Sequence, residues 1–213
     1  MTPLSGIVLW CEILRGRHRL PKVLDHAIMA IDRGARTQVA ILDNFVELSL
    51  AQAGATELAR APVDLAASVR DAVRRNGSGA DAREVRLRFV PPDPACVVEG
   101  DAFRLRNALS NVVDNAVKAS PPGGHVEIVL EHASPTFAIR VTDQGPGIPL
   151  EARPTLFTLP EITEAGVSKR RGGLGLGLPI AHRIVELHGG TIVVADVAPT
   201  GCAVTITLPA SAA

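Results

Sequence analysis

The chain has 213 residues, a formal net charge of zero, 46% hydrophobic residues and only 3% aromatic ones. This length suits one large domain, or a small module followed by a domain of ordinary size, with a core built from Leu, Val, Ile and Ala. The chain lacks the basic stripe typical of a nucleic-acid-binding protein, so no nucleic-acid partner is expected.

Cysteine usage and hydropathy indicate a cellular location. Cys11, Cys96 and Cys202 lie far apart and fit neither a disulfide framework nor metal-ligand spacing, so reduced cytosolic thiols are expected. No apolar run reaches the roughly 18–20 residues of a membrane-spanning helix. We therefore expect a cytoplasmic location, with a membrane link only through an upstream sensor segment outside this sequence.

The first 54 residues predict a helical hairpin. Residues 3–16 place their apolar side chains on one helical face, and a break from Gly16 to Pro21 precedes a second helix over 22–53. The second helix runs about nine turns, and its apolar stripe consists of Leu24, Ile28, Ile31, Ala35, Val39, Leu42 and Phe45. The hairpin packs either on its own domain or on a second hairpin, as a four-helix bundle. We favour the homodimer, because the stripe extends beyond what the short first helix can cover.

Residues 55–64 predict a linker, and residues 65–213 a second domain. Asp64 can cap a helix over about 65–75. The other elements are expected in this order: strands over 85–90 and 96–100, a helix over 102–119 capped by Asp101, strands over 126–130 and 137–141, an irregular segment over 150–173, a helix over 174–188, and strands over 191–194 and 203–208. One layer of helices on one largely antiparallel sheet is an α/β sandwich, so the whole chain is α+β in class.

Three elements of the second domain carry polar or glycine-rich patterns. Asn111, Asn115 and Lys118 share one face of the helix over 102–119, beside the apolar stripe that faces the sheet. This flank is either a solvated amide face or a site in which Asn115 offers its oxygen to Mg²⁺ and Lys118 reaches a phosphate.

The second element is Asp143-Gln144-Gly145-Pro146-Gly147, at the end of a strand. Its glycines let the backbone turn where a side chain would clash. An ordinary β-turn with Asp at its first position is one interpretation. In the other, the carboxylate accepts a hydrogen bond from the amino group of adenine and so excludes guanine.

The third element is the glycine-rich run from Gly172 to Gly177, at the start of the helix over 174–188. Backbone N–H groups at a helix start bind phosphate well. The run is not a Walker loop, because no Gly-Lys-Ser/Thr follows.

Together these elements resemble the nucleotide site of the GHKL ATPase superfamily, which includes gyrase, Hsp90-type chaperones and the sensor histidine kinases. The asparagine element resembles the N box, the Asp143 element the G1 box and the glycine run the G2 box. The resemblance implies an α/β sandwich of the GHKL (Bergerat) type that binds ATP and Mg²⁺.

The resemblance also implies roles for individual residues. Asn115 matches the metal-binding asparagine, Asn111 lies near the γ-phosphate, and Asn111 and Lys118 are the expected catalytic side chains. The ATP-binding residues it implies are Asn115, Lys118, Asp143, Gly145, Gly147, Ile148, Gly173, Leu174, Gly175, Leu176, Gly177 and Leu178.

Between the two glycine elements we expect a lid. Phe157 resembles the first aromatic residue of the F box, but Leu159 and Pro160 stand where its second aromatic is expected. The run from Ser168 to Arg171 either contacts phosphate or is simply solvated.

The start of the chain narrows the resemblance to histidine kinases. Thr2-Pro3-Leu4 resembles the end of the H box, His-Glu-Leu-Arg-Thr-Pro-Leu, and Pro62–Leu65 matches the usual start of the catalytic domain. In this alignment the phosphoacceptor histidine would lie three residues before Met1. His18 and His26 do not take its place and are expected at the surface.

The resemblance implies a kinase core that passes the γ-phosphate of ATP to a histidine and then to an aspartate of a response-regulator receiver domain. Without the acceptor histidine, the chain by itself is expected not to autophosphorylate. The alternative is a kinase-inactive, dimeric ATP-binding regulator or scaffold. An ATPase of the chaperone or repair type is a third option, and the Thr-Pro-Leu hairpin argues against it.

Overall fold

The computed structural model describes residues 57–92, 96–158 and 175–210, the short strands at 162–163 and 166–167, and scattered helical positions between Ile7 and Ser49. The chain divides into two compact units, Met1–Gly54 and Ala55–Ala213. Each unit is considered by itself.

In the first unit, every described position is helical. Of the predicted apolar stripe, Ile28 and Ala35 are buried. The exposed members are Leu24 at 46%, Ile31 at 54%, Leu42 at 53% and Phe45 at 65%. Much of the apolar stripe is therefore uncovered in the single chain. The turn of the predicted hairpin, with His18, lies outside the described residues, and so does His26.

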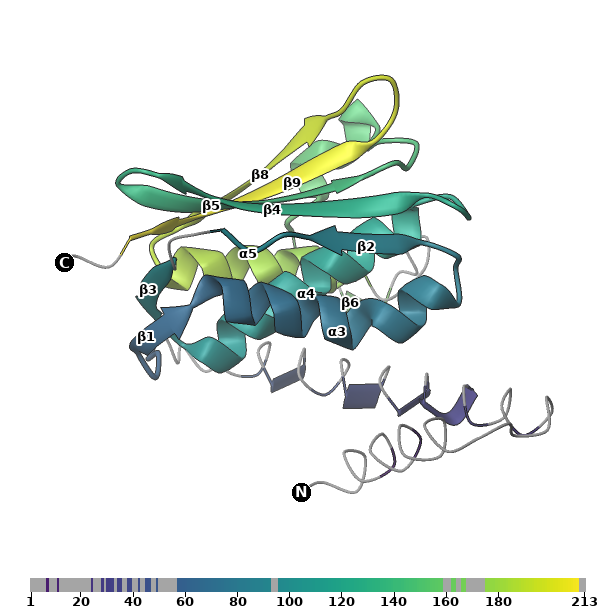
Figure 1. The fold of residues 1–213 in the computed structure, drawn as a ribbon, viewed down its shortest axis with the longest axis horizontal. Helices are drawn as coiled ribbons and strands as arrows, with labels where there is room; N and C mark the ends of the chain where they lie inside the picture. The colour runs from purple at the N-terminus through teal and green to yellow at the C-terminus, as the bar shows by residue number, and fades with distance from the viewer. Residues whose placement is uncertain are drawn as a thin grey trace. The chain divides into compact units, whose positions relative to one another are not determined.

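The second unit is an α/β sandwich, which confirms the predicted fold class (Figure 1). Its main sheet has the strand order β2-β4-β5-β9-β8. Only β2 and β4 pair in parallel, and the other neighbours are antiparallel. The strands are β2 (Arg86–Phe89), β4 (His125–Ala133), β5 (Thr136–Asp143), β8 (Thr191–Asp196) and β9 (Cys202–Pro209).

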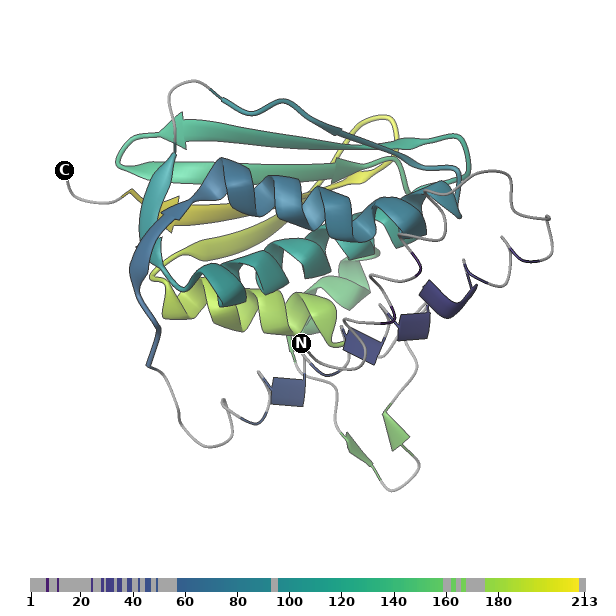
Figure 2. The same cartoon turned by 60° about the horizontal axis from the view of Figure 1, so that its bottom comes forward.

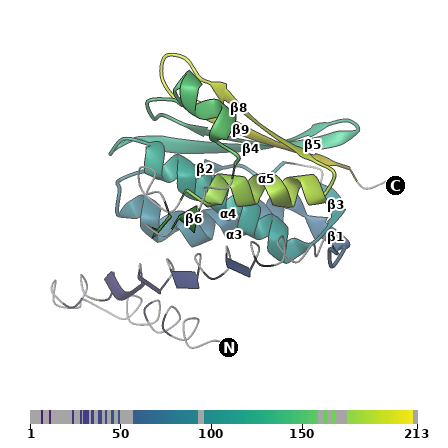
Figure 3. The ribbon, with the colours of Figure 1, turned by 180° about the vertical axis from the view of Figure 1, so that it is seen from behind.

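Three helices lie side by side on one face of this sheet (Figure 2). They are α3 (Leu65–Asp81), α4 (Ala102–Ala119) and α5 (Gly177–Leu187). The central helix, α4, contacts both of the others, and α5 packs on β8 and β9, as the rear view shows (Figure 3). Among the described helices, none combines the length and apolarity that crossing a bilayer demands.

The core between helices and sheet is aliphatic, as the composition predicts. Its largest fully buried side chains are all Leu, Ile or Val; they include Leu65, Leu105, Val112, Ile139, Ile184 and Ile206. Branched aliphatic side chains interdigitate between a helix layer and a pleated sheet without needing hydrogen-bond partners.

The predicted helix caps are confirmed. The Asp64 carboxylate accepts a hydrogen bond from the Ala67 N–H at 3.1 Å, and the Asp101 carboxylate accepts from Phe103 and Arg104 at 3.0 and 3.1 Å. Each cap satisfies N–H groups that have no partner within the helix. α4 has its predicted bounds, whereas α3 continues to Asp81, six residues beyond its predicted end.

Three elements differ from prediction. The second half of the predicted linker is strand β1 (Ala61–Asp64), which pairs with β3 (Val97–Gly100); Pro62 is tolerated because this two-stranded sheet has open edges. The segment over 150–173 is not wholly irregular, since it contains the 3₁₀ helix η1 (Leu150–Thr155) and the short strands β6 (Ile162–Thr163) and β7 (Gly166–Val167). α5 begins three residues late, because Gly175 has a left-handed φ of 68°.

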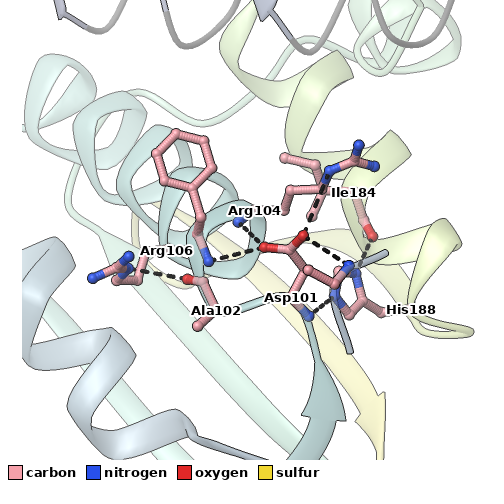
Figure 4. Close-up of polar contacts among 8 residues, drawn as sticks. Asp101, Ala102, Arg104, Arg106, Ile184 and His188 are labelled. Atoms are coloured by element: carbon pink, nitrogen blue, oxygen red, sulfur yellow. Dashed lines mark hydrogen bonds and ion pairs between the residues drawn. The ribbon is translucent and has the colours of Figure 1, made fainter. Parts of the chain in front are cut away.

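A buried histidine joins the end of α5 to the start of α4 (Figure 4). His188 Nε2 accepts a hydrogen bond from the Asp101 N–H at 2.9 Å, so Nδ1 carries the proton and donates to the Ile184 carbonyl at 2.7 Å. Gly100 has no room for a side chain, since a Cβ there would lie 2.7 Å from the imidazole. Burial lowers the pKa of His188 below its ordinary value of 6.5.

This lowered pKa predicts a pH-dependent stability. The unfolded chain takes up a proton at His188 near pH 6.5, whereas the folded chain does so only at lower pH. The free energy of unfolding should therefore fall as the pH drops below about 6.5. Urea unfolding followed by circular dichroism from pH 7.5 to 5.0 measures this, and a His188→Gln variant should show a flatter profile. If the free energy of unfolding depends on pH in the same way in the His188→Gln variant and in the unchanged chain, His188 is not the source of the pH dependence.

Candidate functional site

The asparagine flank of α4 is placed as predicted. The stripe Leu105, Leu109, Val112, Val113 and Ala116 is buried toward the core. Asn111 and Asn115 are half-buried beside it, and Lys118 is exposed. The Lys118 ammonium pairs with the Asp114 carboxylate at 2.6 Å. Among the described residues, none forms a hydrogen bond with the Asn115 amide.

The start of α5 meets this flank at Asn111. A Cβ on Gly177, the first residue of α5, would lie 3.5 Å from the Asn111 Cβ, so the two backbones approach closely there. The first N–H groups of α5 are therefore brought to the amide side of α4. Gly175 and Leu176 are half-buried just before the helix, and Leu178 is buried. Gly173 and Leu174 lie outside the described residues.

Asp143 ends β5 and is 3% exposed. Its carboxylate accepts hydrogen bonds from the backbone N–H groups of Gly145, at 2.8 Å, and of Cys202. Burial nevertheless raises the pKa of this carboxyl, and the two N–H groups oppose the shift. Asp143 is thus a fixed, largely desolvated acceptor.

The loop after Asp143 is held between α4 and β9 by close backbone contacts. A Cβ on Gly145 would lie 2.7 Å from the Ala119 carbonyl oxygen, and a Cβ on Gly201 only 2.3 Å from that of Asp143. Gly147 has a left-handed φ of 78°. Any side chain on Gly145 or Gly201 would push the loop off the sheet edge or off α4.

Several contacts of this loop were not predicted from the sequence. Gln144 accepts a hydrogen bond from the His125 N–H at 3.0 Å, which ties the loop to the start of β4. The Cys202 thiol is buried beside Asp143, and its pKa is raised to about 12, so it stays protonated. Arg153 and Asp196 form an ion pair next to the loop. No local motif marks such contacts, because they join segments distant in sequence.

Within the predicted lid, side-chain contacts are described only for its first part. The Phe157 ring stacks on the His182 imidazole of α5, with ring centroids 5.0 Å apart. Leu159, Pro160 and the run from Ser168 to Arg171 lie outside the described residues, so the lid remains a prediction. The described residues contain no group of three or more His, Cys, Asp and Glu side chains that could hold a metal ion by themselves.

Comparison with known proteins places this chain in a family. Residues 100–212 match the model of the "Histidine kinase-, DNA gyrase B-, and HSP90-like ATPase" family, which covers more than half of the chain. The Escherichia coli K12 sensor histidine kinase ZraS is 34% identical over 154 residues, 72% of this chain and 32% of that protein. The E. coli signal transduction histidine-protein kinase BaeS is 29% identical over 98% of this chain and 44% of its own length.

Solved structures agree with this result. The mycobacterial sensor histidine kinase MprB is 33% identical with a TM-score of 0.61, covering 72% of this chain and 99% of that structure. The Acinetobacter baumannii histidine kinase AdeS, at 21% identity, shares the fold over 99% of this chain and 96% of its own, with a TM-score of 0.65. The chain spans less than half the length of the two curated relatives named above. It belongs to the family of histidine kinase-, DNA gyrase B- and HSP90-like ATPases, as the ATP-binding catalytic domain of a sensor histidine kinase.

Proposed function

We propose that this chain binds ATP with Mg²⁺ along α4 and transfers the γ-phosphate to a histidine, from which a response-regulator aspartate receives it. One observation carries the proposal: α4 meets the start of α5 at Asn111 and the Asp143 loop at Ala119. These two points lie about 12 Å apart along the helix axis. Asn115 and Lys118 lie between them on the same flank.

The Asp143 end of this flank suits adenine. The buried carboxylate can accept a hydrogen bond from the exocyclic amino group of adenine, whereas guanine presents a carbonyl oxygen at that position. Because Asp143 is fixed by the Gly145 and Cys202 N–H groups, it needs no rearrangement to accept this bond. Ile148, half-buried at the end of the loop, offers an apolar side chain to the base.

The Asn111 end suits the phosphates. The first N–H groups of α5 favour an anion, and Asn111 faces the same place. Mg²⁺ takes oxygen ligands and is often held by one or two protein groups together with substrate phosphates. The Asn115 amide oxygen fits this role, with the metal arriving on the nucleotide. Lys118 would exchange its exposed partner Asp114 for a phosphate at little cost.

In the transfer itself, the bond between Pγ and the β,γ-bridging oxygen breaks, a bond from Pγ to an imidazole nitrogen forms, and ADP leaves. Catalysis then consists of holding the nucleotide in line with the imidazole and spreading the charge on the phosphoryl oxygens. The relatives named above are histidine kinases, which supports a histidine acceptor and a response-regulator partner. The exposed apolar stripe of the first unit supports a homodimer through that unit.

Removal of the Asn115 amide should abolish Mg²⁺-dependent nucleotide affinity. In a calorimetric titration with a non-hydrolysable ATP analogue, the unchanged chain should bind more tightly with Mg²⁺ than without it, and Asn115→Ala should lose this difference while keeping its circular dichroism spectrum. Arg106→Ala is a matched control, because nine residues place Arg106 on the opposite side of α4. An undiminished Mg²⁺ effect in Asn115→Ala would remove the metal assignment.

Asp143→Asn should weaken adenine nucleotide binding, because the amide replaces a charged acceptor by a weaker one. A hydrogen bond to a charged group contributes about 1.5–3 kcal/mol, so the Kd for ATP should rise roughly 10- to 150-fold. Competition of ATP and GTP for a fluorescent nucleotide measures both affinities. Equal affinity of the unchanged chain for ATP and GTP would refute the adenine role.

Phosphoryl transfer is tested by a variant in which His-Glu-Leu-Arg precedes Thr2. We expect it to take up acid-labile label from γ-labelled ATP, and the same variant with Gln in place of that added histidine should not. If the histidine variant binds ATP but stays unlabelled, the chain is better described as an ATP-binding regulator than as a kinase.

A further inference from the structure

Arg153, which lies outside the asparagine and glycine motifs, contacts the end of the Asp143 loop. Arg153 lies in η1, and its Nε and Nη2 both donate to the Ile148 carbonyl at 3.3 Å. The same Nη2 also donates to both carboxylate oxygens of Asp196, the last residue of β8. One guanidinium therefore links the end of the loop to the main sheet.

The sheet register explains why this link matters for the loop. Asp143 on β5 pairs with Cys202 on β9, and Cys202 pairs with Asp196 on β8, so the three residues lie in one row across neighbouring strands. Adjacent strands are about 4.8 Å apart, which places the Asp196 backbone roughly 10 Å from that of Asp143. The loop thus leaves the sheet at Asp143 and is tied back to the same sheet edge through Arg153.

The glycine turn of the loop also lies near this edge. A Cβ on Gly147 would lie 3.5 Å from the Gly201 carbonyl oxygen and 3.7 Å from an Asp196 carboxylate oxygen. Asp196 therefore lies near the glycine turn and is paired with Arg153. Without the guanidinium, the Ile148 carbonyl would lose both of these donors, and Asp196 would face the turn as an unbalanced charge.

This ion pair contributes little to global stability. The Arg153 and Asp196 side chains are 30% and 61% exposed, and exposed ion pairs contribute only about 0–1 kcal/mol. A bridge that stabilises the domain so little, yet joins the Ile148 carbonyl to the sheet edge, has its main effect on the position of the loop.

We propose that Arg153 and Asp196 are positioning residues that hold Ile148 and the Asp143 loop in the position needed for adenine recognition. The inference rests on the proposed function and deepens it. It assigns base discrimination to a bridge between η1 and β8 as well as to Asp143. Arg153 touches the loop backbone through Ile148 and acts on the nucleotide through that contact.

The test compares Arg153→Met with Arg140→Met. Arg140 also makes an exposed ion pair, with Glu131 at 3.1 Å, but it lies three residues before Asp143 and so on the opposite face of β5. We expect Arg153→Met to raise the Kd for Mg²⁺·ATP about tenfold and to bring the ATP and GTP affinities closer together, with an almost unchanged melting temperature. Arg140→Met should leave both affinities as they are.

Two further variants refine the result. Arg153→Lys should recover part of the ATP preference, since its ammonium can pair with Asp196 but offers no rigid second donor to the Ile148 carbonyl. Asp196→Asn should also weaken ATP binding and reduce the preference for ATP over GTP, but less than Arg153→Met does. The double variant Arg153→Met with Asp196→Asn should be no worse than Arg153→Met alone, because both changes remove the same bridge.

If Arg153→Met matches Arg140→Met in ATP affinity and in ATP preference over GTP, the inference is overturned. The proposed function then stands, provided that the unchanged chain binds Mg²⁺·ATP and Asp143→Asn weakens that binding. If the unchanged chain binds no ATP, both fail. Should Arg153→Met not fold, Asp196→Asn decides, and an Asp196→Asn variant with unaltered ATP preference overturns the inference.

Discussion

Close backbone packing around Asp143 is the constraint on which the site depends. The loop after β5 passes between the Ala119 carbonyl of α4 and the Gly201 turn before β9, at distances that leave no space for a Cβ on Gly145 or Gly201. Because both neighbours are parts of the rigid sandwich, the loop inherits their position. The packing of the fold therefore fixes the position of the buried Asp143 carboxylate. Its hydrogen bonds to the Gly145 and Cys202 N–H groups fix its orientation.

Helix α4 connects this constraint to the rest of the domain. One of its faces fills the aliphatic core, while the flank with Asn111 and Asn115 is half-buried beside it. Its start is capped by Asp101 and joined to α5 through His188, and its end supports the Asp143 loop. The same helix thus fixes the distance between the proposed phosphate and adenine ends of the site, so a shift of α4 would disturb both ends together.

Local signals predicted much of this arrangement. Asp64 and Asp101 preceded helical patterns and are caps, and the alternating strands of the β4–β5 hairpin formed where expected, because these signals act within a few residues. The end of α3 was missed, since Asn76 donates to carbonyl groups at both Ala72 and Ser110 and so couples the last turns of α3 to α4. Strand β1 was missed because its pairing partner lies about 35 residues later. The Arg153–Asp196 bridge joins residues 43 apart, and no single-sequence pattern reports such a contact.

The aliphatic core has a practical consequence for optical spectroscopy. The chain has no tyrosine and a single tryptophan, Trp10, which lies in the first unit, so the second unit contributes almost nothing to intrinsic fluorescence. Tryptophan emission comes from the helical unit alone, while far-ultraviolet circular dichroism comes from both units. The two signals can therefore be compared in one melting experiment. If a tryptophan were introduced near the Asp143 loop by substitution, the only other tryptophan emission would come from Trp10.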